Sequence, residues 1–161
     1  MDFQPIITTM AKKPPSRGEI SRRKLPPVPN SRAVLICEKI IKDWLTGTVT
    51  VVGVLTRFNM IEYPGFTPGF FLFAQLTGGV GQYDMTYEVQ DEGDGVVMGR
   101  SPPMPLIFES KTEVRDIIIQ IPPVPLNHSG VYTVALFVNG NEVGHQTFDT
   151  PDDGSKDADK S

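Results

Sequence analysis

Short apolar runs, each ended by glycine, proline or aspartate, recur along the chain between Ala33 and Phe148. In the best defined of them, residues 82–90, every second residue is apolar: Tyr83, Met85, Tyr87 and Val89. A period of two places these side chains on one face of a half-buried strand. A chain made of such units folds into β-sheet, because the runs between turn signals are too short for long helices.

Four further runs have the β-branched and aromatic composition that is typical of strands, namely residues 48–58, 69–77, 111–121 and 130–138. Two turn signals predict hairpins: Asp94-Gly95 leads into residues 96–100, and Asn139-Gly140 leads into residues 142–147. An apolar run over residues 33–37 is followed by residues 38–45, which fit either one helical turn or a bent strand.

Seven to eight strands without a long helix predict an all-β fold, namely an antiparallel two-sheet sandwich. Tyr132, two residues after Gly130, resembles the tyrosine corner of immunoglobulin-like sandwiches. Val134 stands where such domains usually have a cysteine, so we expect no disulfide between the sheets.

Charge and proline content divide the chain into three segments. Residues 1–32 hold seven basic and two acidic residues and six of the 15 prolines, and residues 150–161 are mostly acidic and polar. Neither end has enough apolar surface to offset the entropy of ordering the backbone. We therefore expect a disordered basic leader (1–32), a β-sandwich domain (33–149) and a disordered acidic tail (150–161).

The sequence favours a cytoplasmic protein. Its one cysteine cannot form an internal disulfide, and its apolar runs are shorter than the roughly 20 residues of a membrane helix. The chain does not open with a signal peptide. We expect no contact with a membrane.

Several segments together resemble a family of uncharacterised bacterial β-sandwich domains, a domain of unknown function. The matching segments are Leu35-Ile36-Cys37-Glu38, Gly47 to Val54, Phe70 to Phe73, Asp91 to Gly95, Gly130-Val131-Tyr132 and Asn139-Gly140. The resemblance covers about residues 33–149. It implies the sandwich fold and a bacterial cytoplasmic setting, and it brings no catalytic residues.

Few side chains between the tails are suited to proton transfer or nucleophilic attack. His128 lies in the proposed corner turn, where we expect it to hydrogen-bond the loop, and we expect His145 to be an ordinary strand residue. Cys37 falls in an apolar strand and is expected to be buried and inert.

Acidic residues gather in the turn over residues 91–95. Asp91, Glu92 and Asp94 provide oxygen atoms, but the further carboxylates of a calcium loop are missing from the sequence. The two histidines have no zinc-site spacing. We therefore predict no catalytic residue, no cofactor and no metal site.

One motif in the leader is specific enough to suggest a partner. Arg23, Pro26 and Pro29 follow the spacing of a proline-rich ligand, in which an extended helix docks on an SH3-type aromatic groove. The same residues also fit an ordinary proline-rich linker. The basic charge of the leader supports at most weak, salt-sensitive contact with nucleic acid.

Phenylalanines near the glycine-proline stretch form a second candidate surface. Phe66, Phe70 and Phe71 either make an apolar contact patch or belong to the core. The leading hypothesis is a non-catalytic protein-interaction module with an unidentified protein partner. The alternative is an adaptor whose leader presents the SH3-type peptide.

Overall fold

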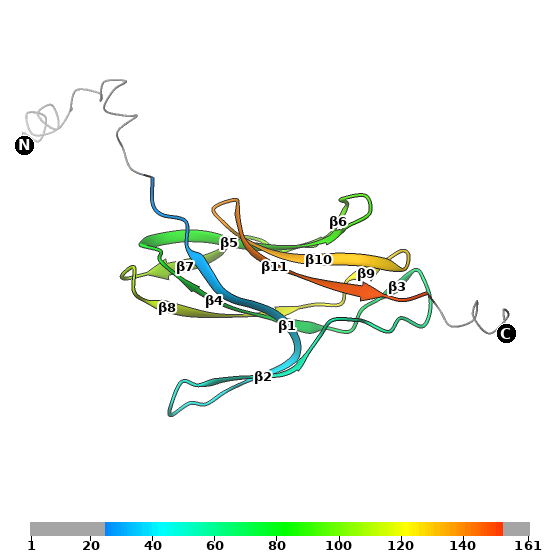
Figure 1. Cartoon of the computed structure of the whole chain (residues 1–161), viewed down its shortest axis with the longest axis horizontal. Helices are drawn as coiled ribbons and strands as arrows, with labels where there is room; N and C mark the ends of the chain where they lie inside the picture. Colours follow the sequence, from blue (N-terminus) through cyan, green and yellow to red (C-terminus); the bar gives the residue numbers. More distant parts are fainter. Residues whose placement is uncertain (1–24, 153–161) are drawn as a thin grey trace, which may run out of the picture.

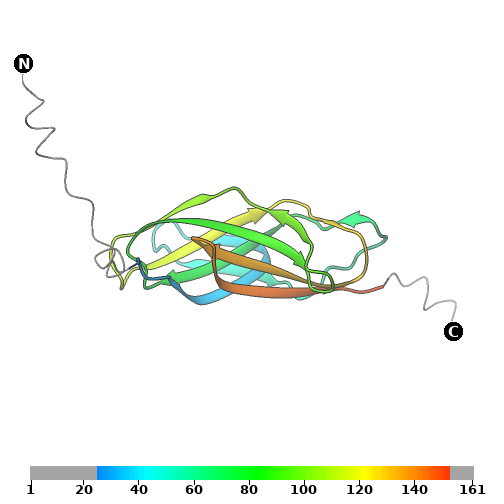
Figure 2. The same ribbon diagram turned by 90° about the horizontal axis from the view of Figure 1, so that it is seen from above.

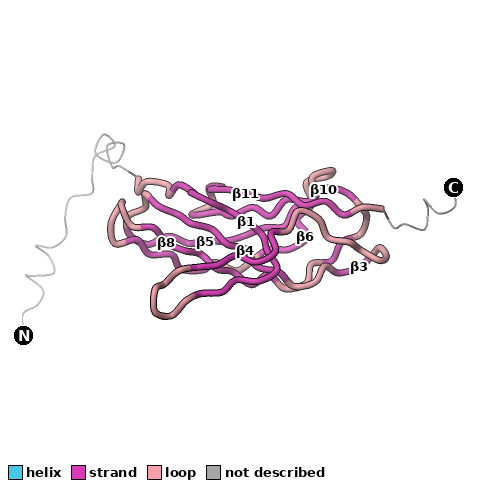
Figure 3. The backbone as a smooth tube through the Cα atoms, turned by 60° about the horizontal axis from the view of Figure 1, so that its bottom comes forward, coloured by secondary structure: helices cyan, strands magenta, loops and turns pink. Residues whose placement is uncertain are grey.

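A computed structural model describes residues 25–152, and within this range the chain consists of strands and loops only (Figures 1 and 3). Every strand pair is antiparallel. The described strands are β1 (Asn30–Lys42), β2 (Val49–Val54), β3 (Gly65–Phe66), β4 (Phe70–Thr77), β5 (Gly81–Asp91), β6 (Val97–Arg100), β7 (Met104–Phe108), β8 (Val114–Ile121), β9 (Pro125–Leu126), β10 (Gly130–Val138) and β11 (Asn141–Thr150).

The strands form two large sheets and one small sheet. The four-stranded sheet has the order β2-β1-β4-β8, and the five-stranded sheet has the order β11-β10-β5-β6, with β7 also paired to β5. Strands β3 and β9 form a separate two-stranded sheet. In Figure 1 the five-stranded sheet lies above the four-stranded sheet, and Figure 2 shows strands running along the length of the molecule.

The two large sheets enclose one hydrophobic core. Strand β4 contributes Leu72, Ala74 and Leu76 from one side, while β10 contributes Tyr132, Val134 and Leu136 from the other. At one end the core is aromatic: the ring centroid of Phe58 lies 5.1 Å from that of Phe70 and 4.9 Å from that of Phe148. Burial of such rings is the main favourable term in the stability of a domain of this size.

The alternation predicted for residues 82–90 is confirmed in β5. Tyr83, Met85, Tyr87 and Val89 are all buried. The Asn139-Gly140 hairpin is confirmed as well, because β10 and β11 pair on either side of it and both turn residues have positive φ, 49° and 80°. A turn of this hand matches the twist of the two strands.

The segment 38–45, expected as either a helical turn or a bent strand, belongs to strand β1 as far as Lys42, and residues 43–45 lie in the turn that follows. β1 begins at Asn30, so the expected boundary between leader and domain at Ala33 falls inside a strand. The remainder of the predicted leader up to Lys24, and the tail from residue 153, lie outside the described residues.

The expected number of strands, seven to eight, is too low, because the structure has eleven in residues 25–152. The three that the sequence did not indicate are β3, β7 and β9. Two of them contain proline, Pro105 in β7 and Pro125 in β9. Proline is tolerated where a strand leaves one edge unpaired, and each of these strands pairs on one side only.

Residues 25–152 hold no helix of the length and apolarity that a membrane crossing would require.

Candidate functional site

An arm projects from the four-stranded sheet. β1 pairs with β4 only as far as Cys37, which lies opposite Phe71, whereas it pairs with β2 out to Lys42 opposite Val49. The last part of β1 and all of β2 therefore extend as a two-stranded ribbon, visible below the sheets in Figure 1. A two-stranded ribbon has little stability alone, because neither face is covered by other strands.

The turn at the tip of the arm is built around Asp43. Its carboxylate oxygen Oδ1 accepts hydrogen bonds from the backbone N–H of Leu45 (2.8 Å) and of Thr46 (3.1 Å). Gly47 closes the turn with a φ of +72° and donates its N–H to the Asp43 carbonyl. The pKa of Asp43 is lowered, first by the amide of Thr46 and then by that of Leu45. The turn holds Trp44 98% exposed and Leu45 97% exposed.

Apolar side chains continue from the tip along the ribbon. Ile41 in β1 is 52% exposed, and Val52 and Val54 in β2 are 39% and 54% exposed. We call Ile41, Trp44, Leu45, Val52 and Val54 the arm surface. This grouping of exposed apolar side chains makes the arm surface a candidate binding surface.

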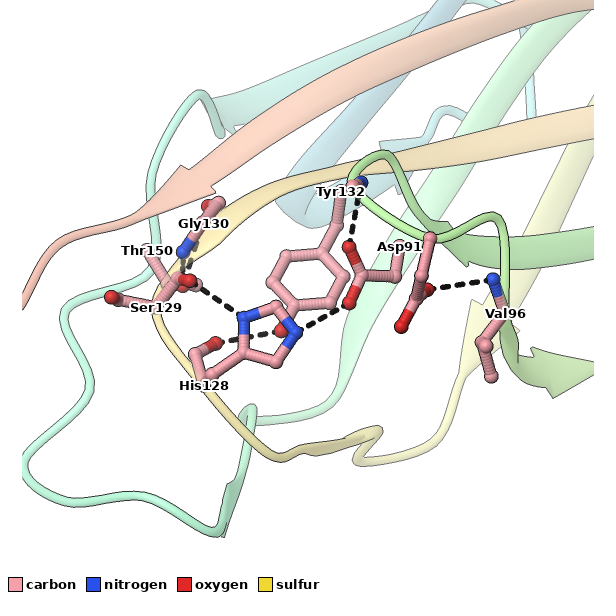
Figure 4. Close-up of polar contacts among 9 residues, drawn as sticks. Asp91, Val96, His128, Ser129, Gly130, Tyr132 and Thr150 are labelled. Atoms are coloured by element: carbon pink, nitrogen blue, oxygen red, sulfur yellow. Dashed lines mark hydrogen bonds and ion pairs between the residues drawn. The ribbon is translucent and has the colours of Figure 1, made fainter.

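A second candidate site, which is polar, lies at the end of the molecule where β5 ends and β10 begins. β10 pairs with β5 so that Tyr132 lies opposite Asp91. This register brings the turn after β5 beside the loop that carries His128 (Figure 4). His128 Nε2 lies 2.6 Å from Asp91 Oδ2, and His128 Nδ1 lies 2.7 Å from the Ser129 carbonyl oxygen. One ligand atom from each of Asp91, Asp94 and His128 lies within 4.8 Å of the others. We call these three residues the loop cluster.

Burial differs sharply within the loop cluster. The Asp91 side chain is 4% exposed and that of His128 is 54% exposed. Hydrogen bonding to the Ser129 carbonyl raises the pKa of His128, and the carboxylates of Asp91 and Asp94 raise it further. The imidazole of His128 is held in place by an acceptor at each ring nitrogen, Asp91 Oδ2 and the Ser129 carbonyl. The predicted role of His128 in hydrogen-bonding its loop is confirmed.

Tyr132 links the loop cluster to the core. Its hydroxyl donates to the His128 carbonyl at 2.7 Å. Its ring stacks on Phe148, with 5.5 Å between centroids. Burial raises the pKa of Tyr132, and Asp91 adds to the shift.

The three phenylalanines proposed as a contact patch do not share one environment. Phe66 in β3 is 69% exposed, Phe71 is half-buried, and Phe70 is 1% exposed within the aromatic core. Phe70 therefore belongs to the core, the second of the two alternatives, since successive residues of a strand point to opposite faces. The contact patch stays a prediction for Phe66 and Phe71.

The proline-rich motif is only partly described. Arg23 lies outside the described residues, Pro26 is exposed and Pro29 is buried. The carbonyl of Pro27 accepts a hydrogen bond from the Tyr83 hydroxyl at 2.7 Å. An SH3-type groove would reach Pro29 only after this segment had left the surface of the domain.

The remaining candidates are placed apart from the loop cluster. Cys37 is fully buried, and this burial raises the pKa of its thiol. His145 in β11 is 3.5 Å from Glu142 on the same strand. Sequence reasoning missed the meeting of His128 with Asp91 and Asp94, because it depends on how β5 pairs with β10.

The described residues form an all-β domain of antiparallel sheets. The chain belongs to DUF6941, a family of unknown function, whose sequence pattern matches residues 32–149. The predicted membership in an uncharacterised domain family is thereby confirmed, and a bacterial origin stays a prediction. No curated protein matches the chain.

Proposed function

We propose that this protein is a non-catalytic interaction module that binds a protein partner through the arm surface. The observation that carries the proposal is the exposure of Trp44 and Leu45 at the tip of a ribbon without covering strands. Tryptophan is the residue most enriched at binding hot spots, and it contributes most when a partner encloses it in a dry pocket. The partner would therefore offer an apolar cleft.

The turn geometry supports a binding role because it fixes the tip before binding. Asp43 holds the amides of Leu45 and Thr46, so the backbone that carries Trp44 has a set conformation. A preformed tip loses less conformational entropy on association than a flexible loop.

In the same proposal the body is an immunoglobulin-like sandwich that serves as a rigid base for the arm. The shared core of the two sheets and the Tyr132 hydrogen bond support it. A bacterial cytoplasmic setting is also part of the proposal, supported by the single, buried, free Cys37. An experimental structure tests the immunoglobulin-like arrangement, and cell fractionation of the source organism tests the cytoplasmic location.

The decisive experiment compares two variants of the full chain. Trp44→Ser combined with Leu45→Ser removes the tip, whereas Ile61→Ser removes an apolar side chain that is 90% exposed in a loop outside the arm. We expect the double variant to lose the partners that the wild type captures from host lysate and the Ile61 variant to retain them. Both should keep the free energy of unfolding within about 0.5 kcal/mol of wild type, since exposed positions contribute little.

Three results would contradict this function. One is capture by the double variant of the same proteins in the same amounts. Another is loss of capture when residues 1–24 alone are deleted, which would favour the adaptor that presents Arg23 and Pro26. The third is sedimentation with phosphatidylglycerol vesicles that depends on Trp44, which would replace the protein partner with a lipid surface.

A further inference from the structure

The loop cluster has more negative charge than its neighbours balance. Among the residues that the structure describes, His128 is the ion-pair partner of Asp91, and Asp94 forms no ion pair. Even a protonated His128 leaves two carboxylates facing one positive charge. Because the Asp91 side chain is almost fully buried, its charge is costly unless a cation compensates it.

The orientation of the imidazole selects one nitrogen for a cation. The Ser129 carbonyl can only accept, so Nδ1 carries a proton and donates it there. Histidines that bind metal ions usually donate their other ring N–H in this way, which fixes the tautomer. The remaining atom, Nε2, faces Asp91 Oδ2 at 2.6 Å (Figure 4). This separation is that of a hydrogen bond, so a proton on Nε2 bridges the two atoms in this arrangement. A metal ion in place of that proton would hold the two atoms about 3.2 Å apart, as ligands about 2.0 Å from a tetrahedral centre.

The carboxylates are also held in fixed orientations. The Gly93 N–H donates to Asp91 Oδ1 at 2.8 Å, and the Val96 N–H donates to Asp94 Oδ1 at 2.9 Å. The other oxygen of Asp91, Oδ2, faces His128 Nε2, and the bond from Val96 leaves Asp94 Oδ2 for a further partner. The β5–β10 pairing holds together the two segments that carry the cluster. One segment provides the buried Asp91 and the exposed Asp94, and the other provides the positioned His128.

We propose that Asp91, Asp94 and His128 form a binding site for a divalent transition-metal ion, with Zn²⁺ as the best match. Imidazole nitrogen and carboxylate oxygen are both zinc ligands, at about 2.0–2.2 Å from the ion, and with three protein ligands a water completes the tetrahedron. Ca²⁺ requires about six to eight oxygen ligands, more than these side chains supply. The ion replaces the proton on Nε2 and ties the turn after β5 to the loop before β10. This site is separate from the arm surface and does not depend on the proposed function.

The test uses the full chain freed of metal by a chelator, at mildly alkaline pH. Calorimetric titration with Zn²⁺ should show one equivalent bound. At a free Zn²⁺ concentration about 100 times Kd, mass action should raise the Tm by about 8–10 °C.

Matched variants locate the ion. His128→Gln and Asp94→Asn should each weaken Zn²⁺ binding by about tenfold or more, at least the loss that follows removal of a supporting group around a metal. His145→Gln removes the other histidine, which also has an acidic neighbour, Glu142 at 3.5 Å, and should leave the affinity unchanged. Asp94 is exposed, so Asp94→Asn keeps the test valid even if His128→Gln folds poorly.

The proposal is wrong if both loop-cluster variants bind Zn²⁺ as tightly as the wild type, since the ion would then be held elsewhere in the chain. It is also wrong if Ca²⁺ raises the Tm as much as Zn²⁺ does, because the nitrogen ligand would then be irrelevant. X-ray absorption of the zinc complex should show a mixed nitrogen and oxygen shell; sulfur in that shell would point to Cys37 and overturn the assignment.

Discussion

Individual side chains in this domain combine a packing role with a polar one. Tyr132 is fully buried against Phe148, yet its hydroxyl reaches the His128 carbonyl. Tyr83 is also buried, and its hydroxyl accepts from the Val80 N–H while donating to the Pro27 carbonyl. Buried tyrosines usually satisfy their hydroxyl in this manner, and here both fasten a loop to a sheet.

Asp43 should titrate below the usual range of an aspartate. Its folded pKa is lowered, so its contribution to the tip turn is present at neutral pH and is lost as the pH falls through that lowered value. Nuclear magnetic resonance of the Leu45 and Thr46 amides between neutral and strongly acidic pH should show this transition. Asp43→Ala should abolish it, and a transition at or above the ordinary aspartate pKa would contradict the turn geometry.

Cys37 should react slowly with thiol reagents in the folded protein. Its side chain is fully buried and its pKa is raised, so little thiolate is present and none of it is accessible at neutral pH. Absorbance of a chromogenic disulfide reagent should show labelling that becomes fast only in denaturing urea. Fast labelling without denaturant would mean that β1 opens readily at this position.

At the level of the elements, β11 of one large sheet packs closely against β1 of the other. A Cβ on Gly144 would lie 2.5 Å from Val34 Cγ2 and 3.2 Å from Ser31 Oγ. Glycine is required there by contact between strands and not by its backbone angle. This contact joins the edge of one large sheet to the other sheet.

Gly144→Ala should therefore destabilise the domain by about 1–3 kcal/mol, the usual effect of overpacking, because the buried Val34 has little room to move. Gly99→Ala is the matched control, since its Cβ would meet Val124 and Val89 at 3.9 and 4.0 Å, which is ordinary contact. Urea unfolding followed by circular dichroism gives both values. Equal stability of the two variants would show that the β1–β11 contact is loose.

Strands with a clear alternation or a high content of strand-forming residues could be predicted from the sequence. Strands that form only because a neighbouring strand offers them an edge could not. Alternation in β5 and the Asn139-Gly140 turn are local signals. By contrast, β7 is a strand because β5 offers it an edge, despite Pro105 within it. The loop cluster is beyond local reasoning for the same reason, since His128 meets Asp91 only through the register of β10 against β5.

For the whole molecule, the described structure includes residues before the domain boundary that composition suggested. Pro29 is buried, and Asn30 and Ser31 pair with Thr77 and Leu76 of β4. The segment from Leu25 to Pro27 lines a surface pocket together with Val80 and Lys111. The family match from residue 32 thus leaves out the first residues of β1.

Two truncations should separate these segments. Deleting residues 1–32 should lower the free energy of unfolding by about 2 kcal/mol relative to deleting residues 1–24, because it removes the bond from Tyr83 to Pro27 and the first pairs of β1. Thermal and urea unfolding of both proteins measure the difference. Equal stability would show that residues 25–32 add nothing to the fold.

Trp44 is the one tryptophan of the chain, and it lies at the tip of the arm, far from any buried environment. Its fluorescence emission should resemble that of free tryptophan in water and should change little when the two sheets unfold. The same property makes the native protein its own reporter, since a shift of this emission to shorter wavelength would register contact at the arm while the core stays spectroscopically silent.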